Sequence, residues 1–247
     1  MDYFSSRRTV RKYAERHIDD SLLNDILSDA THCPTTGNMQ LYSVVISRRR
    51  DIIQRLAPAH FNQPAIIGCD VVLTVCADFN RFVKWCDLRD ANPGYDNFQS
   101  FITAFLDATI FAQQICTIAE IHGLGCCYLG TTTYNAPQIA DVLNLPKRVV
   151  PVVTLTLGYP DETPEDCGRL PLDAVVHNET YHDYSDDDIN RLYSEKESRL
   201  DSRRFVEDNG KQTLAQVFTD VRYTREANEH FSDIFLNFIR SKGFEFD

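Results

Sequence analysis

Apolar residues recur at helical spacing in two stretches of the chain. Between residues 22 and 30 the spacing predicts a helix that Asp19 or Asp20 can cap. A longer pattern over residues 97–122 ends at Gly123, a residue type favoured just after helix C-termini. Its apolar surface is too broad for a helix on the exterior. We therefore expect a central helix that a sheet or a second subunit covers.

Other apolar stretches are shorter and rich in β-branched residues, which is typical of strands in a buried sheet. We predict strands over residues 41–47, 71–77, 126–130 and 152–158. A further helix between the last two strands is predicted to begin at Asn135 and to end near Leu145 and Pro146.

The chain changes character after Tyr159. Residues 161–188 contain ten acidic residues and one basic residue, Arg169. The segment beyond them is charged and polar, and no Gly/Ser linker or repeat marks an independent domain. We expect one domain over residues 1–185, and a C-terminal extension over residues 186–247 that packs on this domain or on a partner subunit.

Composition limits the class of protein. A chain of 247 residues, 43% of them hydrophobic, can bury a sizeable core, and its net charge of −11 argues against a nucleic-acid partner. The longest weakly polar runs, residues 64–77 and 149–158, fall short of the roughly 20 residues that span a bilayer. The eight cysteines include no C-x-x-C pair, so we expect no metal site. We expect a cytoplasmic protein without membrane contact.

The basic residues are unevenly distributed. Residues 7–16 contain five Lys or Arg residues and only one acid, Glu15, although the chain as a whole is acidic. Arg7, Thr9 and Arg11 alternate, so an extended chain would project all three to one side. Two guanidiniums and a hydroxyl on one face can bind a phosphate dianion. The alternative is a solvated basic segment.

Several catalytic motifs are absent from the sequence, and their absence narrows the chemistry. The sequence has no G-x-S-x-G elbow, no phosphate loop of the G-x-x-x-x-G-K type, no H-E-x-x-H pair and no G-x-G-x-x-G fingerprint. Gly123 and Gly125 form too short a glycine pair for a dinucleotide fingerprint, and His177 and His182 would not share a helix face. We interpret all four as structural.

Five motifs in order carry a resemblance to a known family. They are Ser5–Tyr13 (SSRRTVRKY), residues 30–40 (ATHCPTTGNMQ), residues 63–65 (QPA) before a strand, residues 123–130 (GLGCCYLG), and residues 145–151 (LPKRVVP) leading to residues 157–160 (LGYP). Over about residues 3–185 the chain resembles the nitroreductase family of FMN-dependent oxidoreductases. The chain is also similar to the larger, NADPH-preferring branch of nitroreductases and flavin reductases, through residues 168–171 (GRLP), His177 and Tyr181.

The resemblance implies a fold and an assembly. It implies an α+β protein with a three-layer α-β-α fold, in which helices flank a central, mostly antiparallel sheet. It also implies a homodimer with the flavin at the subunit interface, so that each site needs both subunits.

The resemblance also implies the residues of a flavin site. The FMN phosphate would be held by Arg7, Arg8, Thr9 and Arg11, together with Arg169 from the segment that follows the last predicted strand. Gln63 would hydrogen-bond the edge of the isoalloxazine ring, and the backbone around Gly125 and Cys126 would approach flavin N5. Thr35, Thr36 and Asn38 would reach the flavin of the neighbouring subunit.

Five positions, in three places of the chain, depart from the family pattern. Cys126 stands where a second glycine is common, which a backbone contact tolerates unless φ is positive there. Cys167 and Gly168 replace a Lys-Pro pair before Arg169. Threonines replace two serines at residues 35 and 36, where the hydroxyls are retained.

A flavin carries the redox chemistry itself, which is consistent with the absence of catalytic triads and acid–base motifs. The resemblance implies ping-pong hydride transfer from NADPH or NADH through FMN to a small-molecule acceptor, such as a nitroaromatic, a quinone or free flavin, with no catalytic side chain required. Two alternatives stay open: a flavin-binding or sensing protein without turnover, and another flavin reaction such as enone reduction or dehalogenation.

Overall fold

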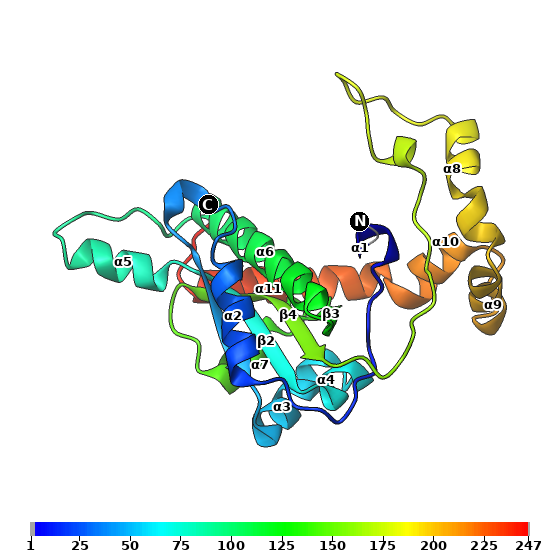
Figure 1. Cartoon of the computed structure of the whole chain (residues 1–247). Helices are drawn as coiled ribbons and strands as arrows, with labels where there is room; N and C mark the ends of the chain where they lie inside the picture. Colours follow the sequence, from blue (N-terminus) through cyan, green and yellow to red (C-terminus); the bar gives the residue numbers. More distant parts are fainter. Residues whose placement is uncertain (1–2, 247) are drawn as a thin grey trace. The chain divides into compact units, whose positions relative to one another are not determined.

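The computed structural model describes residues 3–246, and its centre is a four-stranded sheet in the order β1-β2-β4-β3 (Figure 1). The strands are β1 (Tyr42–Ser47), β2 (Val71–Asp78), β3 (Gly125–Leu129) and β4 (Val149–Gly158). All three neighbouring pairs are antiparallel, with Tyr42 opposite Ala77 and Gly125 opposite Gly158. The antiparallel sheet that we expected is therefore confirmed, within a residue or two except at β4.

Strand β4 begins at Val149, three residues earlier than the pattern predicts, and it contains Pro151. A proline has no N–H for the ladder and usually stays at edges or bulges. Here the register between β2 and β4 shifts between Val75 and Cys76, and Pro151 lies opposite Cys76. The irregularity lets a central strand continue through the proline.

Alternate residues of β2 enter two different cores. Leu73 and Val75 pack in one core with residues of α2 (Asp20–Ala30) and α6 (Phe98–Ile121). Val72 packs in a second core with residues of α3 (Arg50–Leu56) and α4 (Pro64–Gly68). Helices thus cover both faces of the sheet, as Figure 1 shows, and the expected three-layer arrangement is confirmed.

Helix α6 is the central helix that the sequence predicts. The side chain of Asn97 caps it by accepting a hydrogen bond from the N–H of Ser100, and ten of its residues are buried. By length and composition alone, α6 is the one helix among residues 3–246 that could cross a membrane. Its packing against β2 and β4 matches that of the core helix of a globular domain.

The remaining elements are mostly short. They are α1 (Tyr3–Ser6), η1 (Thr36–Asn38), η2 (Ala57–His60), α5 (Asn80–Asp87), α7 (Ala136–Leu143), η3 (Leu172–Ala174), α8 (Asp186–Ser198), α9 (Leu200–Asp208), α10 (Leu214–Val217), η4 (Phe218–Arg222) and α11 (Arg225–Ser241). In α8, Ser185 and Asp188 form a reciprocal cap that satisfies two N–H groups at the start of the helix.

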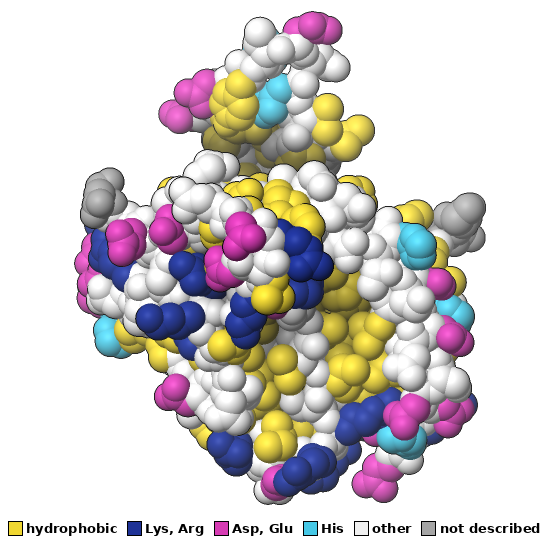
Figure 2. Space-filling view, turned by 90° about the vertical axis from the view of Figure 1, so that its left-hand side faces the viewer, with side chains coloured by type: hydrophobic (Ala, Val, Ile, Leu, Met, Phe, Trp, Pro, Cys, Tyr) yellow, Lys and Arg dark blue, Asp and Glu magenta, His cyan; other side chains and the backbone are white. Residues whose placement is uncertain are grey.

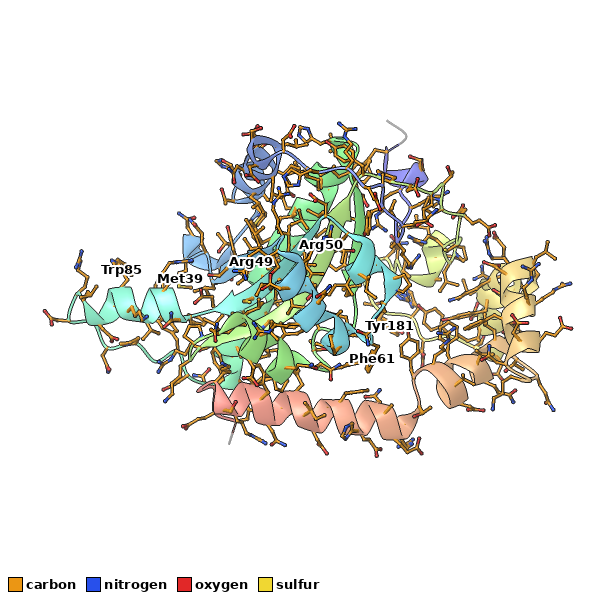
Figure 3. All side chains as sticks on the ribbon, turned by 90° about the horizontal axis from the view of Figure 1, so that it is seen from below. Met39, Arg49, Arg50, Phe61, Trp85 and Tyr181 are labelled. Atoms are coloured by element: carbon orange, nitrogen blue, oxygen red, sulfur yellow. The ribbon has the colours of Figure 1, made fainter. Side chains whose placement is uncertain are left out.

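The chain forms two compact units. Unit 1 comprises Met1–Pro164 and Phe231–Asp247, and unit 2 comprises Glu165–His230. The extension expected over residues 186–247 is thus shared between the units, and its packing on a partner subunit stays a prediction. In unit 1, the ring of Phe231 stacks on Tyr134 at 4.4 Å between centroids and meets Phe61, labelled in Figure 3, edge to face.

Candidate functional site

The basic N-terminal segment is fixed to the sheet by backbone hydrogen bonds. The N–H of Val10 donates to the Cys126 carbonyl at 3.2 Å, and the N–H of Ala14 donates to the Tyr159 carbonyl at 2.8 Å. Tyr13 pairs with Pro160 in an isolated bridge. The segment therefore runs along β3 and along the chain that leaves β4, which is an ordered position for residues 10–14.

Gly125 makes this close approach possible. A Cβ atom placed on Gly125 would lie 2.6 Å from Cβ of Val10, closer than real Cβ atoms approach. A side chain at this position would push the basic segment away from β3. Cys126, the next residue, does not have positive φ and uses its carbonyl toward Val10, so its cysteine side chain fits this backbone.

Arg7 lies inside a polar cluster formed with α6. Its Nε donates to Glu120 Oε1 at 3.1 Å, its Nη1 donates to Thr9 Oγ1 at 3.2 Å, and its Nη2 contacts Cys116 Sγ at 3.9 Å. The Tyr3 hydroxyl donates to Glu120 Oε2 at 2.6 Å. Glu120 thus fixes both Arg7 and Tyr3.

The placing of Arg7 and Arg11 on one side of the segment, which their alternation predicts, stays a prediction. Burial raises the pKa of the Cys127 thiol, and the charges of Arg11 and Arg7 oppose this rise. Arg8 instead donates to the carbonyls of Ser5 and Arg7. Arg7 and Thr9 are thus hydrogen-bonded to each other, whereas Arg8 is bonded to the backbone of its own segment.

The loop that contains Thr35, Thr36 and Asn38 is held by a buried carboxylate of α6. Asp107 is 1% exposed and accepts hydrogen bonds from the Thr35 and Thr36 hydroxyls at 2.5 and 3.0 Å. It also accepts from the N–H groups of Thr36 and Leu41, at 2.9 and 3.3 Å. Both threonine hydroxyls therefore have a partner in their own chain.

Asn38 lies at the outer end of the same loop. It is exposed and has a φ of 55°, and Gly37 before it also has a φ of 55°. Asparagine and glycine tolerate this left-handed conformation better than other residues. The loop thus presents Asn38 and its backbone outward while Asp107 holds its base.

Gln63 precedes α4 and follows two left-handed residues, Phe61 and Asn62, each with a φ of 53°. Within residues 3–246 the side-chain amide of Gln63 has no hydrogen-bond partner, so it is available to a ligand. Nearby His60 is fully buried, shares a hydrogen bond with Thr131 Oγ1 at 2.8 Å, and leaves Nε2 without a partner among the described residues. Burial lowers the pKa of His60 to about 4.

Arg169 belongs to unit 2. It follows Gly168, which has a φ of 65°, and its guanidinium donates to the Gly168 carbonyl at 2.6 Å. With Lys196 and Arg199 it lines a cavity of about 380 Å³. Its expected meeting with Arg7 and Arg11 of unit 1 stays a prediction.

Sequence reasoning missed the two carboxylates that organise the site. Asp107 and Glu120 are the only charged residues of α6, a helix that is otherwise apolar or neutral. Each holds one of the two segments in which we expected the site. An acid inside a long apolar helix was the signal that could have found them, because a buried carboxylate needs partners.

Comparison with known proteins places the chain in a family. Residues 4–159 match the sequence model of the Nitroreductase family. The chain belongs to the nitroreductase family. This membership confirms the family expected from the sequence motifs, the fold, and the class of enzyme, an FMN-dependent NAD(P)H oxidoreductase.

Three relatives illustrate how far the similarity to the nitroreductase family extends. An oxygen-insensitive NADPH nitroreductase of Salmonella typhimurium is 28% identical over 181 residues, which cover 73% of this chain and 74% of that protein. An NAD(P)H FMN reductase of Bacillus subtilis is 29% identical over 214 residues, covering 85% and 84%. A solved structure from Bacteroides fragilis has a TM-score of 0.98 at 51% identity and covers 100% of both chains.

The residues of unit 1 fit the cofactor of the nitroreductase family. Two guanidiniums and a hydroxyl beside β3 supply the paired, charge-assisted donors that a phosphate requires. The unpartnered amide of Gln63 can both donate to and accept from a polar ring edge. The donor set therefore matches both ends of FMN, the phosphate and the isoalloxazine ring.

Proposed function

We propose that this nitroreductase-family protein transfers hydride from NADPH or NADH to nitroaromatics, quinones or free flavin by a ping-pong mechanism, with FMN held between two copies of the chain. Bound FMN supplies the chemistry, which is to accept a hydride from the nicotinamide and to pass the electrons to the acceptor. The side chains of the chain supply binding, orientation and access.

Arg7, Thr9 and Arg11 bind the phosphate in this proposal. The observation that carries it is the ordered position of their segment on β3, with the Arg7 guanidinium hydrogen-bonded to Thr9 Oγ1 at 3.2 Å. Arg7 already forms an ion pair with Glu120. Arg11 is therefore expected to make the stronger electrostatic interaction with a phosphate. The role of Arg169 at the phosphate stays the expectation drawn from the sequence.

Gln63 and β3 orient the ring. The Gln63 amide hydrogen-bonds the polar edge, and the backbone at Gly125 and Cys126 faces the N5 side. No side chain is required as acid or base, since water in an open pocket can supply protons to the acceptor. Accordingly no catalytic residue is assigned.

The second subunit contributes the loop that contains Thr35, Thr36 and Asn38. Asp107 fixes the base of the loop, so Asn38 and the loop backbone are the groups that meet the neighbouring flavin. Exposed hydrophobic residues on α6, Leu106 and Ile110, are four residues apart and so lie on one face of the helix. A second copy covering this face would place the two sites at one interface.

Hydrophobic side chains reach the surface elsewhere as well. Figure 2 views the molecule from the side on which α5 lies, and hydrophobic side chains form an area there that Lys and Arg side chains border. On α5, Trp85 is 55% exposed and is labelled in Figure 3.

We also propose that the protein is soluble and cytoplasmic.

The relatives support the reaction. Their names describe an NADPH nitroreductase, an FMN reductase and, for a Pseudomonas protein 25% identical over 241 residues, a chromium(VI) reductase. The first two names include a reduced nicotinamide, and the three names differ in the acceptor. The acceptor range of this chain is therefore the part of the proposal that needs measurement.

Steady-state oxidation of NADPH and of NADH tests the proposal, with menadione, nitrofurazone or FMN as acceptor. Varying both substrates should give parallel double-reciprocal lines, because the reductant leaves before the acceptor binds. Intersecting lines would contradict the ping-pong order. A yellow protein with no turnover of any acceptor would instead support a flavin-binding or sensing role. Turnover of an activated enone alone would support another flavin reaction.

A further inference from the structure

Two cysteine side chains meet between α6 and β3, beneath the basic segment. Cys116 lies on α6 and Cys126 on β3, and both are free and fully buried. Their sulfur atoms and a carboxylate oxygen of Glu120 all lie within 4.8 Å of one another. The Cys126 thiol also points at the Cys116 carbonyl, with 3.8 Å between sulfur and oxygen. The flavin site as proposed above uses neither thiol.

The two thiols differ in their surroundings. Hydrogen bonding from Cys126 and the guanidinium of Arg7 lower the pKa of Cys116, although burial and the charge of the Glu120 carboxylate oppose them. The hydrogen bond to Cys116 and burial raise the pKa of Cys126. A thiolate next to a thiol is the arrangement in which one sulfur attacks and the other resolves.

We propose that Cys116 and Cys126 are an oxidisable pair, which hydrogen peroxide converts into a disulfide linking α6 to β3. The sulfur atoms must approach by less than about 3 Å to reach the roughly 2.05 Å of a disulfide bond. The short connection between α6 and β3, closed by a hydrogen bond from Leu124 N–H to the Ala119 carbonyl, already holds the two elements together.

The reaction has two balanced steps. The Cys116 thiolate attacks one peroxide oxygen, so a sulfur–oxygen bond forms, the oxygen–oxygen bond breaks, and hydroxide leaves and takes a proton to become water. Cys126 then attacks the sulfenic sulfur of Cys116, so a sulfur–sulfur bond forms and a second water leaves with the Cys126 proton. The two thiols lose two electrons in total, and one peroxide becomes two waters.

Arg7 suits the first step. Its Nη2 lies 3.9 Å from Cys116 Sγ, and its side chain is 24% exposed, so it links the buried sulfur to solvent. Peroxide is a small molecule and can reach the sulfur along this partly exposed side chain. The cation also stabilises the hydroxide that leaves.

A metal ion is the other ligand that two cysteines and a glutamate can hold. The carboxylate argues against it, because Arg7 and Tyr3 already engage both oxygens of Glu120. A metal would have to displace the Arg7 guanidinium and the Tyr3 hydroxyl. The oxidisable pair requires no such displacement.

Peptide mapping of the whole flavin-loaded protein tests this proposal. After treatment with one equivalent of peroxide, non-reducing mass spectrometry should find a peptide that links Cys116 to Cys126 and that dithiothreitol separates. The variant Cys126→Ser should instead accumulate sulfenic acid at Cys116, which dimedone captures. A matched control, Cys69→Ser, removes another buried thiol and should leave the linkage intact.

Other outcomes would overturn the proposal. Cys116 and Cys126 that remain fully alkylatable after peroxide treatment and denaturation, in a wild-type sample whose exposed Cys167 is oxidised, would exclude the pair. One tightly bound zinc ion per chain that protects both thiols from alkylation would identify a metal site instead. The wild-type result decides the matter even if a variant fails to fold.

Discussion

Two carboxylates of α6 fix the segments on which the proposed flavin site depends. Asp107 holds the loop at residues 35–41, and Glu120 holds Arg7 and Tyr3. The two acids lie on one helix, so the two segments keep a fixed relation to each other through α6. At the residue scale, the site depends on these long-range partners as much as on the residues that meet the cofactor.

Arg11→Ala should weaken FMN binding by about 1.5–3 kcal/mol, because a charge-assisted bond to the phosphate is lost. Flavin content after dialysis, and the dissociation constant by fluorescence, measure this loss. Lys12→Ala is the matched control: Lys12 is next in the chain but pairs with Asp161 at the surface. Equal flavin retention in the Arg11 variant and the wild type would remove Arg11 from the site.

Asp107→Asn should lower the free energy of unfolding by about 2–3 kcal/mol, because the amide NH₂ would face donors that the carboxylate now accepts. Urea unfolding monitored by circular dichroism measures the change. Asp87→Asn, at an exposed position of α5, should change stability little. If both variants unfold at the wild-type urea concentration, Asp107 does not anchor the loop.

His60 should make stability depend on pH. Its pKa is about 4 in the fold because of burial, and about 6.5 when the chain unfolds, so the unfolded state binds the proton first as pH falls. Stability is thus fully present above pH 6.5 and declines toward pH 4, by about 2 kcal/mol between pH 7.5 and pH 5. The free energy of unfolding of the wild type, relative to that of His60→Gln, should fall by about 2 kcal/mol between pH 7.5 and pH 5. A constant difference between the two proteins would refute this role.

At the scale of elements, the close contact between Gly125 of β3 and Val10 sets the position of the basic segment. Gly125→Ala should destabilise the protein by about 1–3 kcal/mol, as overpacking does, and should lower flavin retention. Val10→Ala in the same chain should restore part of both. Gly130→Ala, where a Cβ meets nothing within 4 Å, is the control for a neighbouring glycine. If the stability losses of Gly125→Ala and Val10→Ala simply add in the double variant, the contact between Gly125 and Val10 does not set the position of the segment.

The sequence predicts the elements that bury a periodic apolar face. Helices α2 and α6 and all four strands follow from such patterns, and Asn97 and Gly123 mark the ends of α6. The sequence does not predict helices α8 and α9, because most of their residues are polar and show no periodic apolar face. Only Leu192 is buried. The pattern predicts a shorter β4 because it does not show the register shift at Val152, the extra residue of β4 that lets the strand continue through Pro151.

The candidate site was predictable only where the chemistry is local. The alternation of Arg7, Thr9 and Arg11 is visible in nine residues, and the structure joins Arg7 to Thr9 by a hydrogen bond. The partner of Thr35, in contrast, is 72 residues away, and no local pattern connects the two. A carboxylate inside an apolar helix indicates that a partner exists but does not say which one.

At the scale of the whole molecule, the proposed site needs parts that one copy of unit 1 does not supply. Arg169 belongs to unit 2, and the loop containing Asn38 is expected to serve the neighbouring subunit. The exposed apolar residues of α6 give that second copy a surface to cover. Flavin binding and dimer formation should therefore be lost together, so they are best measured together.

The most direct test of the account is an absorbance spectrum of the purified protein taken during size-exclusion chromatography with light scattering. We predict a yellow dimer that carries one FMN per chain. A colourless protein that stays colourless after incubation with FMN, or a monomer that retains FMN stoichiometrically, would contradict it.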